Sequence, residues 1–101
     1  MSWNDIETML SGFAYDAYYN QNETSKKNYF TVFDYAIDQG FAYGSGMGTN
    51  HHYGYQVRKI YTTAWLMRDA IYKHPHRDAY LSTLRFLGGS ARNSSAMLSN
   101  T

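Results

Sequence analysis

Apolar side chains recur at intervals of three and four residues in four separate stretches of the chain. This spacing places them on one face of a helix, because an α-helix turns once about every 3.6 residues. No stretch shows the alternation with period two that is typical of a strand. The predicted fold class is therefore all-α, built from antiparallel helical hairpins. The apolar positions are Ile6, Met9, Leu10, Phe13, Ala14 and Ala17; Tyr29, Phe30, Phe33, Ala36 and Ile37; Val57, Ile60, Tyr61, Ala64, Met67 and Ile71; and Tyr80, Leu81, Leu84 and Leu87.

Glycine and proline mark the expected ends of these helices. Gly40 follows the second stretch and can adopt the left-handed conformation that often ends a helix, so this helix is predicted to end near Gln39. Pro75 restricts the residue before it, so the third helix is predicted to end at or just before His74. The fourth helix is predicted to begin with Pro75 in its first turn and to end at residues 88–89.

Composition excludes several classes of protein and site. The 101 residues suffice for one small domain and include no Cys, which excludes disulfides, thiolate zinc sites and a cysteine nucleophile. No apolar run approaches the roughly 18 residues needed to span a membrane, and residues 1–5 do not resemble a signal peptide. The eleven Tyr side chains suit packed helices and also suit stacking on sugar rings.

Charge is divided unevenly along the chain. Residues 1–40 carry two basic and six acidic side chains, a net charge of −4, whereas residues 41–101 carry seven basic and two acidic side chains, a net charge of +5. Two interpretations fit the second part. Its basic side chains either face a polyanion or belong to solvated helix faces.

A glycine-rich segment, residues 44–55, presents two adjacent histidines and two tyrosines at the start of a helix. Its glycines fit neither G-x-G-x-x-G nor a P-loop, and no strand precedes them, which excludes these nucleotide-binding motifs. A metal site is weakly supported, because adjacent His side chains point in different directions and no suitable Cys or carboxylate completes the set. The segment is either a tight connection or a loop that displays His and Tyr to a ligand. The histidines in question are His51 and His52, with His74 and His76 further along the chain.

The side chains of this segment suit an acidic substrate that loses a proton next to its carboxylate. An imidazole, with an ordinary pKa of about 6.5, can act as a base near neutral pH. A Tyr hydroxyl, with an ordinary pKa of about 10, needs a positive neighbour such as Arg58. Asn50 can donate a hydrogen bond to a carboxylate.

Residues 34–55 and 60–70 closely resemble a segment of the chondroitin sulfate ABC lyases of polysaccharide lyase family 8. The first range reads Asp-Tyr-Ala-Ile-Asp-Gln-Gly-Phe-Ala-Tyr-Gly-Ser-Gly-Met-Gly-Thr-Asn-His-His-Tyr-Gly-Tyr, and the second reads Ile-Tyr-Thr-Thr-Ala-Trp-Leu-Met-Arg-Asp-Ala. In the family, G-S-G-M-G-T precedes H-H, an aromatic residue, G-Y, and a helix with L-M and D-A. The resemblance covers about residues 28–87 and implies part of an incomplete (α/α) toroid in a longer bacterial enzyme.

The resemblance also implies a chemistry, β-elimination at a uronic acid, and roles for six residues. His51 matches a position that serves a composite site accepting both epimers of the uronic acid, which makes it the candidate catalytic residue. The family's main catalytic group begins with an R-H-E-G-N-Y type motif, which these 101 residues do not contain. Five further residues are candidate substrate-binding residues. Arg58 matches an Arg of the family segment, and Asn50, His52, Tyr53 and Tyr55 match the family only because they lie next to or near His51.

Two functions are compatible with these observations. Residues 1–87 are predicted to form part of a helical lyase catalytic domain, inactive alone, and residues 88–101 a poorly ordered tail. The alternative is a non-catalytic helical module that binds acidic glycans. The expected partners are chondroitin or dermatan sulfate and the remainder of a lyase chain, rather than nucleic acid or a membrane, and no cofactor or metal is expected. The parent protein is expected to be secreted or periplasmic, although residues 1–5 are not a signal peptide.

Overall fold

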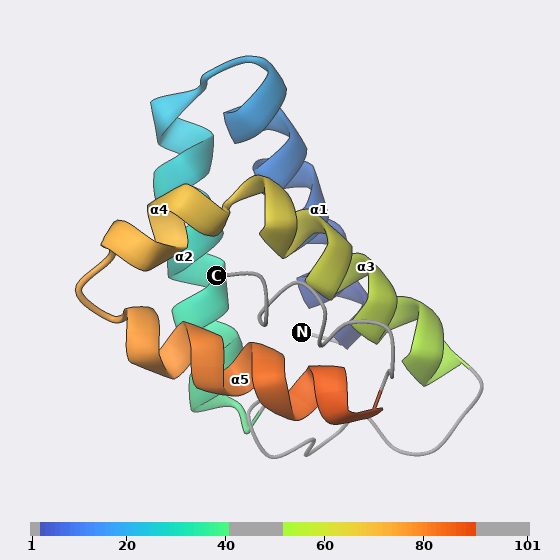
Figure 1. Cartoon of the computed structure of the whole chain (residues 1–101). Helices are drawn as coiled ribbons and strands as arrows, with labels where there is room; N and C mark the ends of the chain where they lie inside the picture. Colours follow the sequence, from blue (N-terminus) through green and yellow to red (C-terminus); the bar gives the residue numbers. More distant parts are fainter. Residues whose placement is uncertain (1–2, 41–51, 91–101) are drawn as a thin grey trace.

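Residues 3–40 and 52–90 are described by the computed structural model, and every regular element in these two ranges is an α-helix (Figure 1). The absence of strands from these ranges confirms the predicted all-α class. Within them, no helix combines the length and the apolarity needed to cross a bilayer. The helices are α1 (Trp3–Tyr19), α2 (Glu23–Asp38), α3 (His52–Leu66), α4 (Arg68–Lys73) and α5 (Arg77–Ser90).

The helices pack mainly through α1 and α3. α1 and α2 form the predicted antiparallel hairpin, and α1 also contacts α3 (Figure 1). α5 contacts α3 and α4. Its first turn also meets the second half of α2, where the Tyr80 hydroxyl donates a hydrogen bond to Asp34 Oδ1 at 2.7 Å. A toroid that contains these helices stays a prediction.

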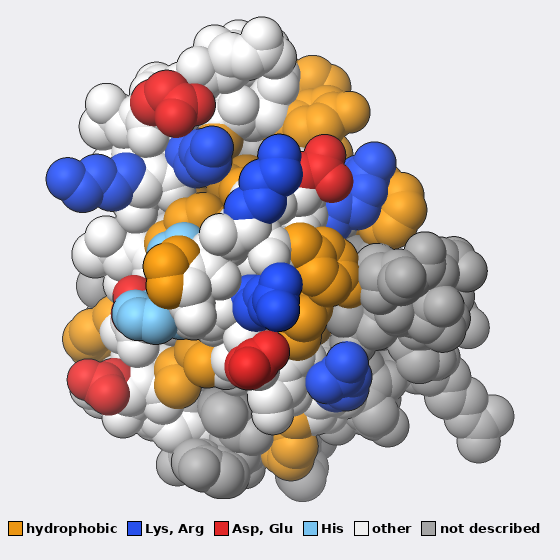
Figure 2. Space-filling model, turned by 60° about the vertical axis from the view of Figure 1, so that its left-hand side comes forward, with side chains coloured by type: hydrophobic (Ala, Val, Ile, Leu, Met, Phe, Trp, Pro, Cys, Tyr) orange, Lys and Arg blue, Asp and Glu red, His pale blue; other side chains and the backbone are white. Residues whose placement is uncertain are grey.

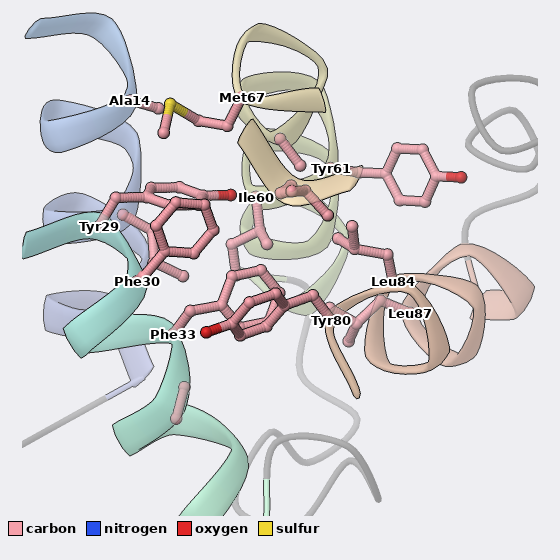
Figure 3. Packing of buried hydrophobic residues seen from close by; sticks show 14 of the residues in the cluster. Ala14, Tyr29, Phe30, Phe33, Ile60, Tyr61, Met67, Tyr80, Leu84 and Leu87 are labelled. Carbon is pink, nitrogen blue, oxygen red and sulfur yellow. The ribbon is translucent and has the colours of Figure 1, made fainter. Parts of the chain in front are cut away.

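Aromatic rings from α2 and α5 form the centre of the core. Phe33 is fully buried, and its ring centroid lies 5.8 Å from that of Tyr29 and 4.7 Å from that of Tyr80 (Figure 3). Burying an apolar side chain of this size contributes roughly 1.5–3 kcal/mol to stability. The predicted apolar faces are confirmed by the buried residues Ile6, Leu10, Ala14, Tyr29, Phe30, Phe33, Ala36, Ile60, Tyr61, Ala64, Met67, Ile71, Tyr80, Leu84 and Leu87.

Asp16 organises the turn between α1 and α2. Its carboxylate accepts hydrogen bonds from Asn20 Nδ2 at 2.6 Å, from Asn22 Nδ2 at 2.7 Å and from the Ser25 hydroxyl. These bonds, first of all the one from Asn20, hold the pKa of Asp16 below its usual value. Asn22 caps α2, since its Oδ1 accepts from the backbone N–H of Ser25 at 3.2 Å. The turn therefore has a fixed shape, even though Gln21 adopts a φ of 51° that is unusual for a residue with a side chain.

Gly40 ends α2 in the predicted way. Its φ is 91°, and its backbone N–H donates to the carbonyl oxygen of Ile37 at 3.0 Å. The N–H of Gln39 donates to Tyr35 at 3.1 Å. A left-handed glycine after the last helical turn is a common helix end, because it needs no Cβ there.

The prediction of one continuous third helix is wrong, because the structure divides it at Met67. Met67 has φ −98° and ψ 8°, and its N–H bonds to Ala64 three residues back at 3.0 Å. The carbonyl of Trp65 accepts instead from Arg68 Nη1 at 2.9 Å, and the Arg68 guanidinium lies 3.9 Å from the centroid of the Trp65 ring. The chain changes direction here without a glycine or proline, and a side chain takes up the freed carbonyl.

The predicted end of the third stretch is confirmed, but the predicted start of the fourth helix is wrong by two residues. α4 ends at Lys73, whereas α5 begins at Arg77, after Pro75. His74 is extended, with ψ 142°, as favoured before proline, and its Nδ1 accepts from the backbone N–H of His76 at 3.0 Å. This bond keeps the chain in a turn through Pro75. α5 continues to Ser90, just beyond the expected end.

Two buried tyrosines give a matched test of this packing. Tyr80→Phe is expected to lower the free energy of unfolding by about 1 kcal/mol, because it removes the hydrogen bond to Asp34. Tyr29→Phe is expected to be neutral or stabilising, because the buried Tyr29 hydroxyl has no hydrogen-bond partner within residues 3–40 and 52–90. Urea unfolding followed by circular dichroism measures both. A larger loss for Tyr29→Phe than for Tyr80→Phe would contradict this assignment.

The same tyrosines predict a loss of stability in alkali. Burial raises the pKa of Tyr29, with a further contribution from Tyr80, and burial also raises the pKa of Tyr80, which is next to the Asp34 carboxylate. An unfolded Tyr ionises near pH 10, so above about this pH the folded state binds more protons than the unfolded state. Stability should be full below about pH 10 and fall as the pH rises above it. In Tyr29→Phe the fall should be shallower, and an equal slope in both proteins would refute the prediction.

Candidate functional site

The predicted site lies around the start of α3. His51 and Asn50 lie outside the described residues, so the catalytic assignment of His51 stays a prediction. His52 was expected on the connection between helices, but it is the first residue of α3. Tyr53 and Tyr55 follow it in the same helix, and the side chains of these three residues also lie outside the described part.

The helical backbone brings only some of the predicted residues to one side. His52, Tyr55 and Arg58 follow one another at intervals of three residues, about 60° around the helix, so His52 and Arg58 are about 120° apart with Tyr55 between them. Tyr53 is rotated from His52 in the opposite direction, about 160° from Tyr55 and about 140° from Arg58. The four predicted residues within α3 therefore do not share one face of that helix.

Arg58 has a described side chain, and that side chain is exposed. Within the described residues its guanidinium forms no ion pair. A guanidinium can donate two parallel hydrogen bonds to a carboxylate or a sulfate. Arg58 is thus free to meet an anionic group near the start of α3.

The second histidine pair contributes to the fold in the turn between α4 and α5. The His74 ring packs on Phe30, with 4.4 Å between centroids, and lies 5.2 Å from the ring of His76. His76 Nδ1 lies 4.0 Å from the Asp34 oxygen that accepts from Tyr80. The sequence indicated these histidines only as weak metal ligands, and their packing could not be predicted because it depends on contacts between the α4–α5 turn and α2. In the described ranges, no group of three or more His, Asp or Glu side chains is arranged to hold a metal ion.

The comparison with known protein families identifies the chain. The family model described as "Lyase, catalytic" matches residues 1–99. The chain belongs to this lyase family. The match confirms the resemblance to polysaccharide lyase family 8 and extends it over residues 1–27 and 88–99, for which the sequence motifs had no counterpart.

Two curated relatives are chondroitin sulfate ABC lyases. The chain is 44% identical over 46 residues to the chondroitin sulfate ABC exolyase of Bacteroides thetaiotaomicron, which is 46% of this chain and 4% of that protein. It is 39% identical over 51 residues to the chondroitin sulfate ABC endolyase of Proteus vulgaris, 50% of this chain and 5% of that protein. The chain therefore matches about one twentieth of the length of these relatives. No solved structure matches it.

Proposed function

We propose that the chain forms part of the catalytic domain of a lyase that cleaves chondroitin and dermatan sulfate by β-elimination at uronic acid residues. The observation that carries this proposal is the family match over residues 1–99. The names of both relatives, chondroitin sulfate ABC lyases, support the substrate class. The remainder of the lyase chain and an acidic glycosaminoglycan are the partners of this segment, and the lyase acts outside the cytoplasm.

In this mechanism a base removes the proton from C5 of the uronic acid. The electron pair forms the C4–C5 double bond, the bond from C4 to O4 breaks, and O4 leaves with a proton from an acid. Arg58 is suited to bind the uronate carboxylate, because its exposed guanidinium is unpaired within the described residues. Asn50 can add a hydrogen bond to the same group.

His51 is proposed as the base for one of the two epimers. Glucuronate and iduronate differ in configuration at C5, so the proton lies on opposite faces of the sugar ring. One fixed base cannot reach both faces equally well, since a base must lie within hydrogen-bond distance of the proton that it removes. An imidazole on the glycine-rich segment is assigned to iduronate, and the downstream catalytic group to glucuronate. His52, Tyr53 and Tyr55 are assigned to binding the sugar.

A non-catalytic module that binds acidic glycans is the second candidate. The net charge of +5 on residues 41–101 and the exposure of Arg58 favour binding of a polyanion. Sequencing the coding region beyond residue 101 distinguishes the two functions. Continuation into an R-H-E-G-N-Y type motif supports the lyase, and a separate gene that ends here supports the module.

A chimera tests the assignment of His51. The part of the Bacteroides exolyase that corresponds to residues 28–87 of this chain is replaced by these residues, with His51 or with His51→Ala. The His51 chimera is expected to form unsaturated uronate, followed by ultraviolet absorbance. His51→Ala should lower turnover of dermatan sulfate roughly 10²- to 10⁴-fold, as removal of a general base does, and turnover of chondroitin sulfate much less.

Two controls accompany this experiment. His52→Ala should cost less and should affect both substrates alike. The isolated 101-residue chain should form no unsaturated uronate, because groups that act as a unit lose nearly all activity when members are missing. Equal losses on both substrates for His51→Ala would reduce His51 to a shared substrate contact. A folded chimera without activity would count against the lyase assignment itself.

A further inference from the structure

A groove crosses the end of the molecule where α1 ends, α2 begins and α4 lies. It consists of two hollows of about 580 Å³ and about 320 Å³. The hollows share four lining residues, so they form one continuous groove rather than two separate sites. The shared residues are Glu23, Lys26, Ala70 and Lys73.

Three lysines line this groove. Lys26 and Lys27, on α2, are the only basic side chains in residues 1–40, and the fold places both beside Lys73 of α4. Lys26 forms an exposed ion pair with Glu23 at 3.8 Å, whereas Lys27 and Lys73 pair with no carboxylate among the described residues. Figure 2 shows Lys and Arg side chains across the face of the molecule that carries α4. The groove thus offers ammonium groups that an anion can bind.

The lining carries fewer acidic than basic side chains. Glu23 and Asp69 are the acidic residues of the larger hollow, and Glu23 alone is acidic in the smaller one, against the three lysines there. The smaller hollow therefore has a net charge of +2 when its lining His74 is neutral. An anionic group is favoured most at this end.

Exposed tyrosines line the other end of the groove. The side chains of Tyr18 and Tyr19 are 46% and 66% exposed and line the larger hollow. Their rings meet edge to face at 4.9 Å, and Tyr19 also stacks on Tyr15 at 6.1 Å with an interplanar angle of 15°. Ring contacts hold these side chains in place without burying them. Exposed aromatic faces of this kind can stack on the apolar face of a pyranose ring.

The groove has a fixed frame. The hydrogen bonds to Asp16 fix the turn that carries Gln21 and Glu23, and the break at Met67 directs α4 across the end of the α1–α2 hairpin. Backbone positions on two different helices thereby bring lysines to one groove without a ligand. A site formed in advance loses less conformational entropy on binding.

We infer that this groove binds an anionic polysaccharide, with Lys26, Lys27 and Lys73 contacting sulfate or carboxylate groups and Tyr18 and Tyr19 stacking on a sugar ring. The ligand class rests on the proposed function. The location of the groove does not rest on the proposed function, because the groove lies away from the predicted site. Arg58 and Met67 are nine residues apart, about 13 Å along the helix axis. The groove lies at the end of α3 opposite its start (Figure 1). It is a second contact region for the chain of the glycan.

Isothermal titration of the 101-residue chain with a chondroitin sulfate octasaccharide tests the inference. Lys26→Gln/Lys73→Gln is expected to weaken binding about tenfold, the loss of two exposed charge contacts. The control, Lys59→Gln/Arg85→Gln, removes the same charge from exposed positions that do not line the groove and should change binding less than about twofold. Tyr18→Ala/Tyr19→Ala should weaken binding severalfold, and added salt should weaken it in the unmodified chain.

Chemical shifts of the unmodified chain provide a second readout that needs no variant. Amide signals of residues 17–27 and 66–74 should move on titration. The inference is overturned if binding is absent, if the control variant loses as much affinity as Lys26→Gln/Lys73→Gln, or if only residues 52–59 respond. It is also overturned if a single-stranded oligonucleotide of equal charge binds more tightly. Each of these results leaves the activity of the chimera unaffected, so the proposed function is judged separately.

Discussion

The packing of Phe33 against Tyr80 joins the first half of the chain to the second. These residues are 47 positions apart, yet their ring centroids lie 4.7 Å apart, and the Tyr80 hydroxyl bonds to Asp34 on the same helix as Phe33. α2 and α5 are thereby held together although the glycine-rich segment and two helices separate them in sequence. Ile60 of α3 and the apolar residues of α1 fill the space that this contact defines (Figure 3).

This core separates two ends with different chemistry. At one end, the start of α3 carries the residues that resemble the lyase family, with Arg58 exposed beside them. At the other end, Lys26 and Lys73 line a groove between the α1–α2 turn and α4. A long anionic polysaccharide, the ligand proposed above, is extended enough to contact both ends.

The sequence predicted the features that depend on local spacing. Apolar periodicity identified the buried faces, and Gly40 and Pro75 identified two helix ends, because each acts through its own backbone geometry. The break at Met67 could not be predicted, since it depends on a side chain, that of Arg68, replacing a backbone donor. The groove could not be predicted either, because Lys26 and Lys73 become neighbours only through packing. At the predicted site, the family motif suggested the role of His51, and helical spacing places Tyr55 between His52 and Arg58 around α3.

The aromatic contact between α2 and α5 lies at the centre of this fold. Nuclear Overhauser spectroscopy of the 101-residue chain measures that contact directly. Cross-peaks are expected between the ring protons of Tyr80 and those of Phe33 and Phe30, whose ring centroids lie 4.7 Å and 5.3 Å from that of Tyr80. A helical chain whose spectrum shows Tyr80 without contacts to either ring would contradict the account.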